Sequence, residues 1–133
     1  MNSKIRLILS NAGLRITKPR MEIFDVIELS SEPISIADII KKTPTLDKVS
    51  VYRTVKLFVE LGLLHTVFNG WKQFYELATP FAAHHHHLIC NQCGRVTEIH
   101  SEQVEKLIVE LTNEYKFLPT QHHFEIKGKC SLC

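Results

Sequence analysis

Residues 47–77 read DKVSVYRTVKLFVELGLLHTVFNGWKQFYEL, and this stretch predicts a helix followed by a β-hairpin. Asp47 is a typical helix N-cap, apolar residues recur behind it at helical spacing, and Gly62 ends the pattern. Two β-rich runs follow and flank Asn69-Gly70, a dipeptide that is the strongest short-range signal for a hairpin. The stretch therefore predicts a capped helix that leads directly into a two-stranded hairpin.

The residues before this stretch predict further helices. Apolar residues have helical spacing over 5–12, and Thr17 is a suitable N-cap for a second helix. Ser35, with Asp38 three positions later, resembles a capping box that opens a short helix ending before Pro44. Three helices followed by a two-stranded hairpin form the winged-helix arrangement, in which we expect the helix directly before the hairpin to recognise DNA.

Two features of this region suit DNA. Tyr52 and Arg53 are expected on the exposed face of the helix capped by Asp47, where Arg can reach guanine or phosphate and Tyr a base methyl or phosphate. Five basic residues also precede the first acidic residue, Glu22, and could follow a phosphate backbone: Lys4, Arg6, Arg15, Lys18 and Arg20. The alternatives are an ordinary surface helix and a solvated positive surface.

Composition limits the class of protein. The chain has 133 residues, of which 44% are hydrophobic and 23% charged, which is typical of a globular protein. No run approaches the roughly 18 apolar residues of a membrane helix, and the first residues lack the pattern of a signal peptide. We therefore expect a cytoplasmic protein whose four cysteines are reduced thiols or metal ligands.

The pattern indicates two domains in an α+β fold. Residues 1–78 form the winged-helix domain, with eleven Lys and Arg against eight Asp and Glu, and residues 79–83 resemble a hinge. Residues 84–133 hold five basic against six acidic residues and predict a small α/β domain. Its expected elements are strands over 84–90, 96–99 and 120–126 and an amphipathic helix capped by Ser101.

Two CxxC pairs, Cys90-Asn-Gln-Cys93 and Cys130-Ser-Leu-Cys133, lie in this second domain. Four thiolates complete the tetrahedral coordination of Zn(II) and leave no position for a substrate, so the predicted role of the metal is structural. A zinc ion would also fasten the C-terminus to the strand region, which stabilises a domain with a small core. The competing interpretation is a redox-active CxxC, which the second pair disfavours.

The run His84-His85-His86-His87 directly precedes the first CxxC pair. Side chains alternate between the two faces of an extended strand, so His84 and His86 are expected on one side and His85 and His87 on the other. One segment could therefore begin two metal sites, each with two imidazoles. The alternative is a run of exposed polar side chains. His100 has no evident partner, and we expect it to lie on the surface.

Other functions are compatible with a zinc-binding chain. A zinc hydrolase or deaminase would use the histidines as an open catalytic site, but the sequence contains neither the His-x-Glu of the deaminases nor an HExxH motif. A structural zinc module that only mediates protein association is a further alternative. The predicted hairpin and the basic N-terminal segment argue against such a module.

Residues 84–98, HHHHLICNQCGRVTE, closely resemble the histidine-cysteine signature of the ferric uptake regulator (Fur) superfamily. The resemblance covers nearly the whole chain: GLRITKPR at 13–20 is similar to the family's opening segment, VSVYRTV at 49–55 to its recognition helix, and the terminal CxxC to its structural zinc pair. It implies a homodimeric, metal-activated repressor of metal homeostasis genes. The implied partner is double-stranded operator DNA, with no membrane and no small-molecule substrate.

The resemblance also implies roles for individual residues. Structural zinc would be held by Cys90, Cys93, Cys130 and Cys133. One regulatory site, within the dimerisation domain, would use His84, His86, Glu105 and His122. A second, at the hinge, would use His85, His87 and Glu98, with Glu76 or His65 from the hairpin. The positions expected to contact DNA are Arg15, Ser50, Tyr52 and Arg53.

The chain departs from each branch of the family. Iron-sensing members usually have Asp where His86 stands and a His where Pro33 stands, and peroxide sensors have Asp at Glu98. Zinc-sensing members of one branch share the four-histidine run, but they have an acid at His65 and a Cys at Thr79. Because nitrogen-rich ligation suits Zn(II) as well as Fe(II) and Ni(II), we expect regulatory Zn(II), with Fe(II) as the alternative.

Overall fold

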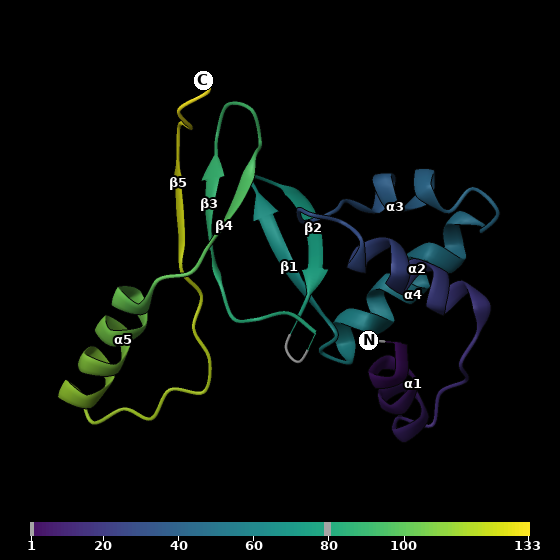
Figure 1. Cartoon of the computed structure of the whole chain (residues 1–133), viewed down its shortest axis with the longest axis horizontal. Helices are drawn as coiled ribbons and strands as arrows, with labels where there is room; N and C mark the ends of the chain where they lie inside the picture. The colour runs from purple at the N-terminus through teal and green to yellow at the C-terminus, as the bar shows by residue number, and fades with distance from the viewer. Residues whose placement is uncertain (1, 79–80) are drawn as a thin grey trace. The chain divides into compact units, whose positions relative to one another are not determined.

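The computed structural model describes residues 2–78 and 81–133, and its contacts divide the chain into two units, Met1–Ala83 and His84–Cys133 (Figure 1). The first unit contains four helices and a hairpin, in the order α1 (Asn2–Asn11), α2 (Lys18–Glu28), α3 (Ile36–Lys42), α4 (Lys48–Glu60), β1 (Leu64–Asn69) and β2 (Lys72–Leu77). The expected α+β class and the winged-helix arrangement are therefore confirmed.

Side-chain caps begin three of these helices at the predicted residues. Thr17 accepts a hydrogen bond from the backbone N–H of Arg20 at 3.4 Å and opens α2. Ser35 accepts one from Asp38 at 3.2 Å and opens α3. Each cap satisfies a backbone donor that has no partner within its helix.

Helix α4, the expected recognition helix, is capped by Asp47, whose carboxylate accepts a hydrogen bond from the backbone N–H of Ser50 at 3.1 Å. Val51, Val55 and Phe58 of this helix are buried in the core of the unit. Because the buried positions recur at helical spacing, the opposite face of α4 is left to solvent.

Aromatic rings form the centre of this core. The ring of Phe24 lies edge-on to Phe58, with centroids 6.4 Å apart, and to Phe81, with centroids 5.1 Å apart. Phe81 lies in the expected hinge, 79–83, but its ring is buried in the first unit. Thr79 and Pro80 lie outside the described residues, and the domain boundaries and hinge stay a prediction.

The hairpin turn lies one residue later than the sequence predicts. Asn69 pairs with Lys72 in the antiparallel register, so Gly70 and Trp71 form the two-residue loop. Gly70 has a φ of +64°. A glycine with positive φ at the first central position is typical of a type II′ turn, one of the two turns that match the twist of a hairpin. Asn69 therefore belongs to β1 and not to the turn.

The second unit has a three-stranded sheet and one helix: β3 (His86–Cys90), β4 (Val96–Ile99), α5 (Glu102–Glu114) and β5 (Glu125–Gly128). The strand order is β4-β3-β5, and β3 pairs antiparallel with β4 and parallel with β5. The strand expected over 84–90 begins only at His86. The strand expected over 120–126 is also misplaced, because only residues 125–128 pair with β3.

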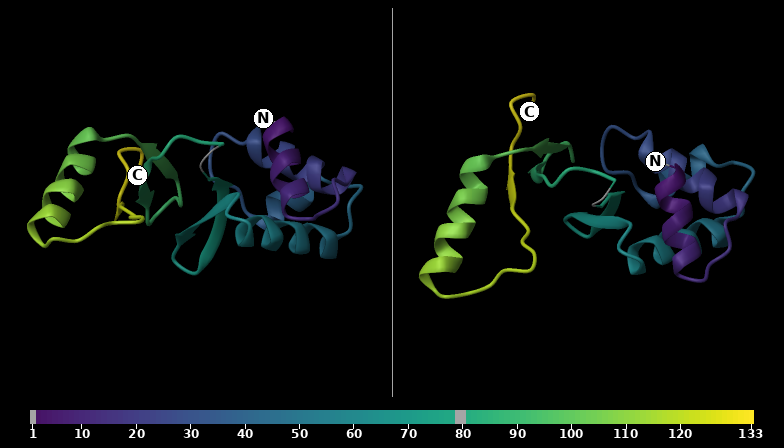
Figure 2. Two further views of the ribbon diagram at one scale, coloured as in Figure 1. Left: turned by 90° about the horizontal axis from the view of Figure 1, so that it is seen from below. Right: turned by 60° about the horizontal axis from the view of Figure 1, so that its bottom comes forward.

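Helix α5 is amphipathic as predicted, and Ser101 caps it, but no residue of the helix is buried. The side chains of Leu107, Leu111 and Tyr115 are 52%, 46% and 75% exposed. Both views in Figure 2 show α5 standing off the sheet of its unit. Within residues 2–78 and 81–133, no helix combines the length and the apolar character needed to cross a bilayer.

Candidate metal centres

The four cysteines come together in one cluster without a disulfide bond. The sulfur atoms of Cys90 and Cys133 are 3.9 Å apart, those of Cys93 and Cys130 3.7 Å, and those of Cys130 and Cys133 3.5 Å. Ligands at about 2.3 Å from a tetrahedral Zn(II) lie about 3.8 Å from one another. The cluster is therefore compatible with a structural zinc site.

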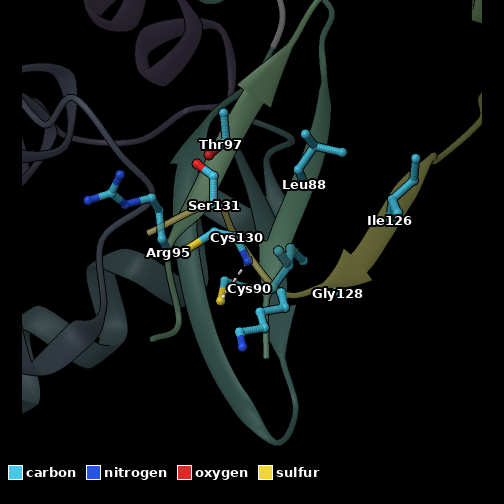
Figure 3. Close-up of a pocket in the computed structure, with 10 residues that line it drawn as sticks. Leu88, Cys90, Arg95, Thr97, Ile126, Gly128, Cys130 and Ser131 are labelled. Atoms are coloured by element: carbon cyan, nitrogen blue, oxygen red, sulfur yellow. Dashed lines mark hydrogen bonds between the residues drawn. The ribbon is translucent and has the colours of Figure 1, made fainter. Parts of the chain in front are cut away.

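Hydrogen bonds set the protonation of the cluster. The backbone N–H groups of Cys93 and Cys130 point at the sulfur of Cys90 from 3.5 and 3.4 Å, and they lower the pKa of Cys90 to about 6. Figure 3 shows the bond from Cys130. Hydrogen bonding to Cys130 and Cys93 raises the pKa of Cys133 to about 12. Metal binding at neutral pH must therefore displace a proton from Cys133, so the affinity for zinc rises with pH.

A second cluster joins His84, His86, Glu105 and His122, whose ligand atoms all lie within 4.8 Å of one another. One oxygen of Glu105 lies 2.6 Å from Nε2 of His86 and 3.1 Å from Nε2 of His84, and the other lies 3.3 Å from Nε2 of His122. Glu105 stands in the first turn of α5, and His86 is buried in β3. The helix therefore contributes a carboxylate to imidazoles from two other segments.

The charge of Glu105 suits a cation. Hydrogen bonds, first from His86 and then from His122, hold the pKa of Glu105 below its ordinary value. The carboxylate is therefore ionised throughout the neutral pH range. Three imidazoles and one carboxylate form a ligand set that fits Zn(II) or Fe(II), and their role as ligands stays a prediction.

We expect Glu105→Ala to lower the affinity of this cluster for a regulatory metal at least about 100-fold, because loss of an outer-shell partner alone costs about 10–100-fold. Competition with a chelator of known affinity measures the effect. Glu110→Ala is the matched control, because Glu110 is exposed on the same helix and is not part of a cluster. Equal affinities of the two variants would exclude Glu105 as a ligand.

The remaining histidines of the run lie near Glu98. Nδ1 of His85 is 3.4 Å from the Glu98 carboxylate, and the rings of His85 and His87 have centroids 4.9 Å apart. His100, expected on the surface without a partner, has its Nε2 3.1 Å from the same Glu98 oxygen. His100 is exposed, as expected, but it does have a partner. Glu98 lies two residues earlier on the same extended segment, and residues two apart on a strand share a face.

The hairpin holds the other two predicted ligands of the hinge site. His65 in β1 and Glu76 in β2 are direct cross-strand partners. Directly paired residues point to the same face of an antiparallel ladder. Both residues belong to the first unit, and their participation in a site with His85 and His87 stays a prediction.

The residues expected to contact DNA all lie in the first unit. Tyr52 and Arg53 are on the exposed face of α4, and the side chain of Tyr52 is 55% exposed. Ser50 donates its hydroxyl proton to Asp47 at 2.6 Å, so this hydroxyl is part of the helix cap. Arg15 is exposed between α1 and α2, and its carbonyl accepts a hydrogen bond from Arg20. Their contacts with DNA stay predictions.

The chain is similar to known proteins over most of its length. The Ferric uptake regulator family model matches residues 11–127. A ferric uptake regulation protein of Vibrio parahaemolyticus is 34% identical over 129 residues, and the match covers 92% of this chain and 85% of that protein. The structure of the Vibrio cholerae ferric uptake regulator has a TM-score of 0.78 at 31% identity, covering 92% of this chain and 96% of that one. A zinc uptake regulator complexed with zinc and DNA has a TM-score of 0.61 at 26% identity, covering 98% and 91%.

A winged-helix unit combined with thiolate and imidazole clusters defines a metal-responsive transcription regulator. The chain belongs to the Ferric uptake regulator family. Members of this family are DNA-binding regulators and not enzymes, which excludes the hydrolase or deaminase alternative. The preference for the zinc-sensing branch is not confirmed, since relatives named for ferric uptake regulation match at 30% identity and above.

Proposed function

We propose that this chain is an Fe(II)-responsive repressor that binds operator DNA as a homodimer. The observation that carries the proposal is the cluster of His84, His86, Glu105 and His122, a nitrogen- and oxygen-rich set that suits Fe(II). The relatives named ferric uptake regulation protein favour iron over the zinc that the sequence analysis preferred. The protein would act in the cytoplasm.

Zn(II) remains the second candidate for the regulatory metal. Each predicted set contains at least two imidazoles, and His86 stands where iron-sensing members of the family usually have Asp. Neutral imidazole is a preferred ligand of Zn(II). The similarity to a zinc uptake regulator in complex with zinc and DNA is consistent with this alternative.

The proposed mechanism is a metal clamp. An ion held by His85, His87 and Glu98, with Glu76 or His65 from the hairpin, would link the two units of each chain. Metal stabilises the linked form only through its higher affinity for that form. The linked form would hold the two α4 helices of a dimer at the spacing of successive major grooves in a palindromic operator.

The homodimer is supported by apolar surface in the second unit. Leu107 and Leu111 of α5 are exposed, and so is Tyr115 directly after the helix. On the sheet, Leu88 and Ile126 line an open cavity of about 380 Å³ next to Cys130 (Figure 3). Exposed large apolar side chains that form a contiguous patch are typical of an interaction site. A second copy of the chain would cover it and complete the core that a single second unit lacks.

In the proposed complex, α4 enters the major groove. Tyr52 and Arg53 would contact bases or phosphates, while Ser50 and Arg15 would contact the backbone at the edges of the groove. The basic N-terminal residues would add contacts with phosphates that do not depend on the base sequence.

The test measures operator affinity at buffered free Fe(II), Zn(II), Ni(II) and Mn(II), without oxygen, on an operator selected from random DNA. We expect Fe(II) to tighten binding by about 5–150-fold, the usual range of allosteric coupling. Arg53→Ala is the control, since it should lose DNA affinity and keep metal affinity. Tightening by Zn(II) but not by Fe(II) would favour the second candidate. An affinity that no metal changes would refute both.

A further inference from the structure

Four potential ligands share one side of the β3–β4 ladder in the second unit. The antiparallel register pairs His87 with Glu98 and His86 with Ile99. Continued by one residue, the same register sets His85 opposite His100. Side chains at alternate positions of paired strands share a face, so His85, His87, Glu98 and His100 point the same way.

Two of the three imidazoles lie close to the Glu98 carboxylate. One Glu98 oxygen is 3.4 Å from Nδ1 of His85 and 3.1 Å from Nε2 of His100. The ring centroids of His85 and His100 are 6.0 Å apart. Two imidazoles that share one ion, each with its nitrogen at about 2.0–2.1 Å, have centroids about 5.2 Å apart at a tetrahedral angle and about 6.4 Å apart when they are trans to each other. The separation of His85 and His100 lies between these two values.

We propose that His100 is a metal ligand, and that His85, His87, Glu98 and His100 hold a divalent cation entirely within the second unit. The proposal rests on the function proposed above. It adds to the clamp model a third form of the protein, in which the ion is bound but does not link the two units. The side chain of His100 is 60% exposed, which makes it accessible to an incoming ion. None of the four ligands belongs to the DNA-binding unit.

In this arrangement, binding of the ion and linking of the two units are separate events. The four residues of the β3–β4 ladder would hold the ion while the two units are not linked. In the linked form, Glu76 or His65 of the hairpin would take the place of His100 as a ligand. His100 thereby raises the affinity for the ion and competes with the step that activates DNA binding.

The test uses the full chain with its structural zinc, in a His84→Ala/His122→Ala background that disables the other regulatory cluster. Co(II) is the probe, its affinity is measured without DNA, and its X-ray absorption counts the coordinated imidazoles. His100→Ala should lower Co(II) affinity at least tenfold and remove one imidazole. His123→Ala, which removes an exposed histidine of the same unit, should change affinity less than twofold. His65→Ala/Glu76→Gln, which removes the two candidate ligands of the hairpin, should change the Co(II) affinity less than threefold.

Two results would overturn the proposal. One is an equal Co(II) affinity of the His100→Ala and His123→Ala variants. The other is a lower affinity with an unchanged imidazole count, which would make His100 a positioning residue for Glu98. Should the background variant fail to fold, the same substitutions are compared in the native chain, with ions counted by native mass spectrometry.

Operator binding separates this proposal from the proposed function. At saturating metal, His100→Ala should still bind the operator in a metal-dependent manner, whereas His65→Ala/Glu76→Gln should not. If added metal does not change the operator affinity of the native chain, the proposed function is refuted. The assignment of His100 would then still be decided by Co(II) affinity and by the imidazole count.

Discussion

Cys90→Ser/Cys93→Ser is expected to release zinc and to unfold the second unit. The described part of this unit buries only five residues: His86, His87, Ile89, Cys90 and Val96. So small a core supplies little hydrophobic stabilisation, and a structural zinc ion contributes about 10–16 kcal/mol in zinc-finger peptides. Metal analysis should find zinc lost, and circular dichroism should show the strands and helix of this unit lost at 25 °C.

The first unit provides an internal reference for this experiment. Its core, around Phe24 and Phe58, contains no cysteine, so its thermal transition should persist in the variant. Asn91→Ala is the matched control, because Asn91 lies between the two substituted cysteines and is not one of the clustered thiols. Retention of a folded second unit after complete loss of zinc would show that the cluster has no structural role.

His85→Ala/His87→Ala is expected to abolish the metal stimulation of operator binding and to leave the fold intact. The two substitutions remove both histidines from the clamp, and metal then has no higher affinity for the linked form. The variant should lose the entire increase in operator affinity that metal causes in the native chain, about 5–150-fold. Fluorescence anisotropy with labelled operator, with and without Fe(II) or Zn(II), measures it.

His123→Ala serves again as a control that removes an imidazole outside the clusters. The cysteine site should keep its zinc in the double variant, so the fold is verified by metal analysis and by the thermal transition. Metal-dependent operator binding that survives in the double variant would refute the clamp. Among the clusters of the described residues, the one around Glu105 would then be the candidate for the sensor.

The first unit was largely predictable because its signals are local. Thr17, Ser35 and Asp47 each bond a backbone N–H three residues ahead, so a window of a few residues predicts where α2, α3 and α4 begin. The hairpin was predictable for the same reason. Its turn was displaced by one residue because Asn69 pairs with Lys72, and pairing depends on the whole hairpin.

The second unit was less predictable because its signals act at long range. The start of β5 at Glu125 depends on pairing with β3, almost forty residues earlier in the chain. The approach of His85 to Glu98 depends on the register between β3 and β4. The apolar stripe of α5 was predicted, but no residue of the helix is buried in its own unit. The periodicity of a sequence predicts which face of a helix is apolar, but it does not predict which residues pack against that face.

Strand β3 combines roles that are usually distributed among several elements. It is the middle strand of its sheet, its two sides carry His86 and His87 toward different ligand groups, and its last residue is Cys90. An insertion or deletion of one residue in this strand would reverse the sides of the histidines and shift the thiol at the same time. Substitution of one ligand in β3 would disable one metal site. A change in the length of the strand would displace the ligands of all three groups at once. We therefore expect homologous proteins to keep the length of β3.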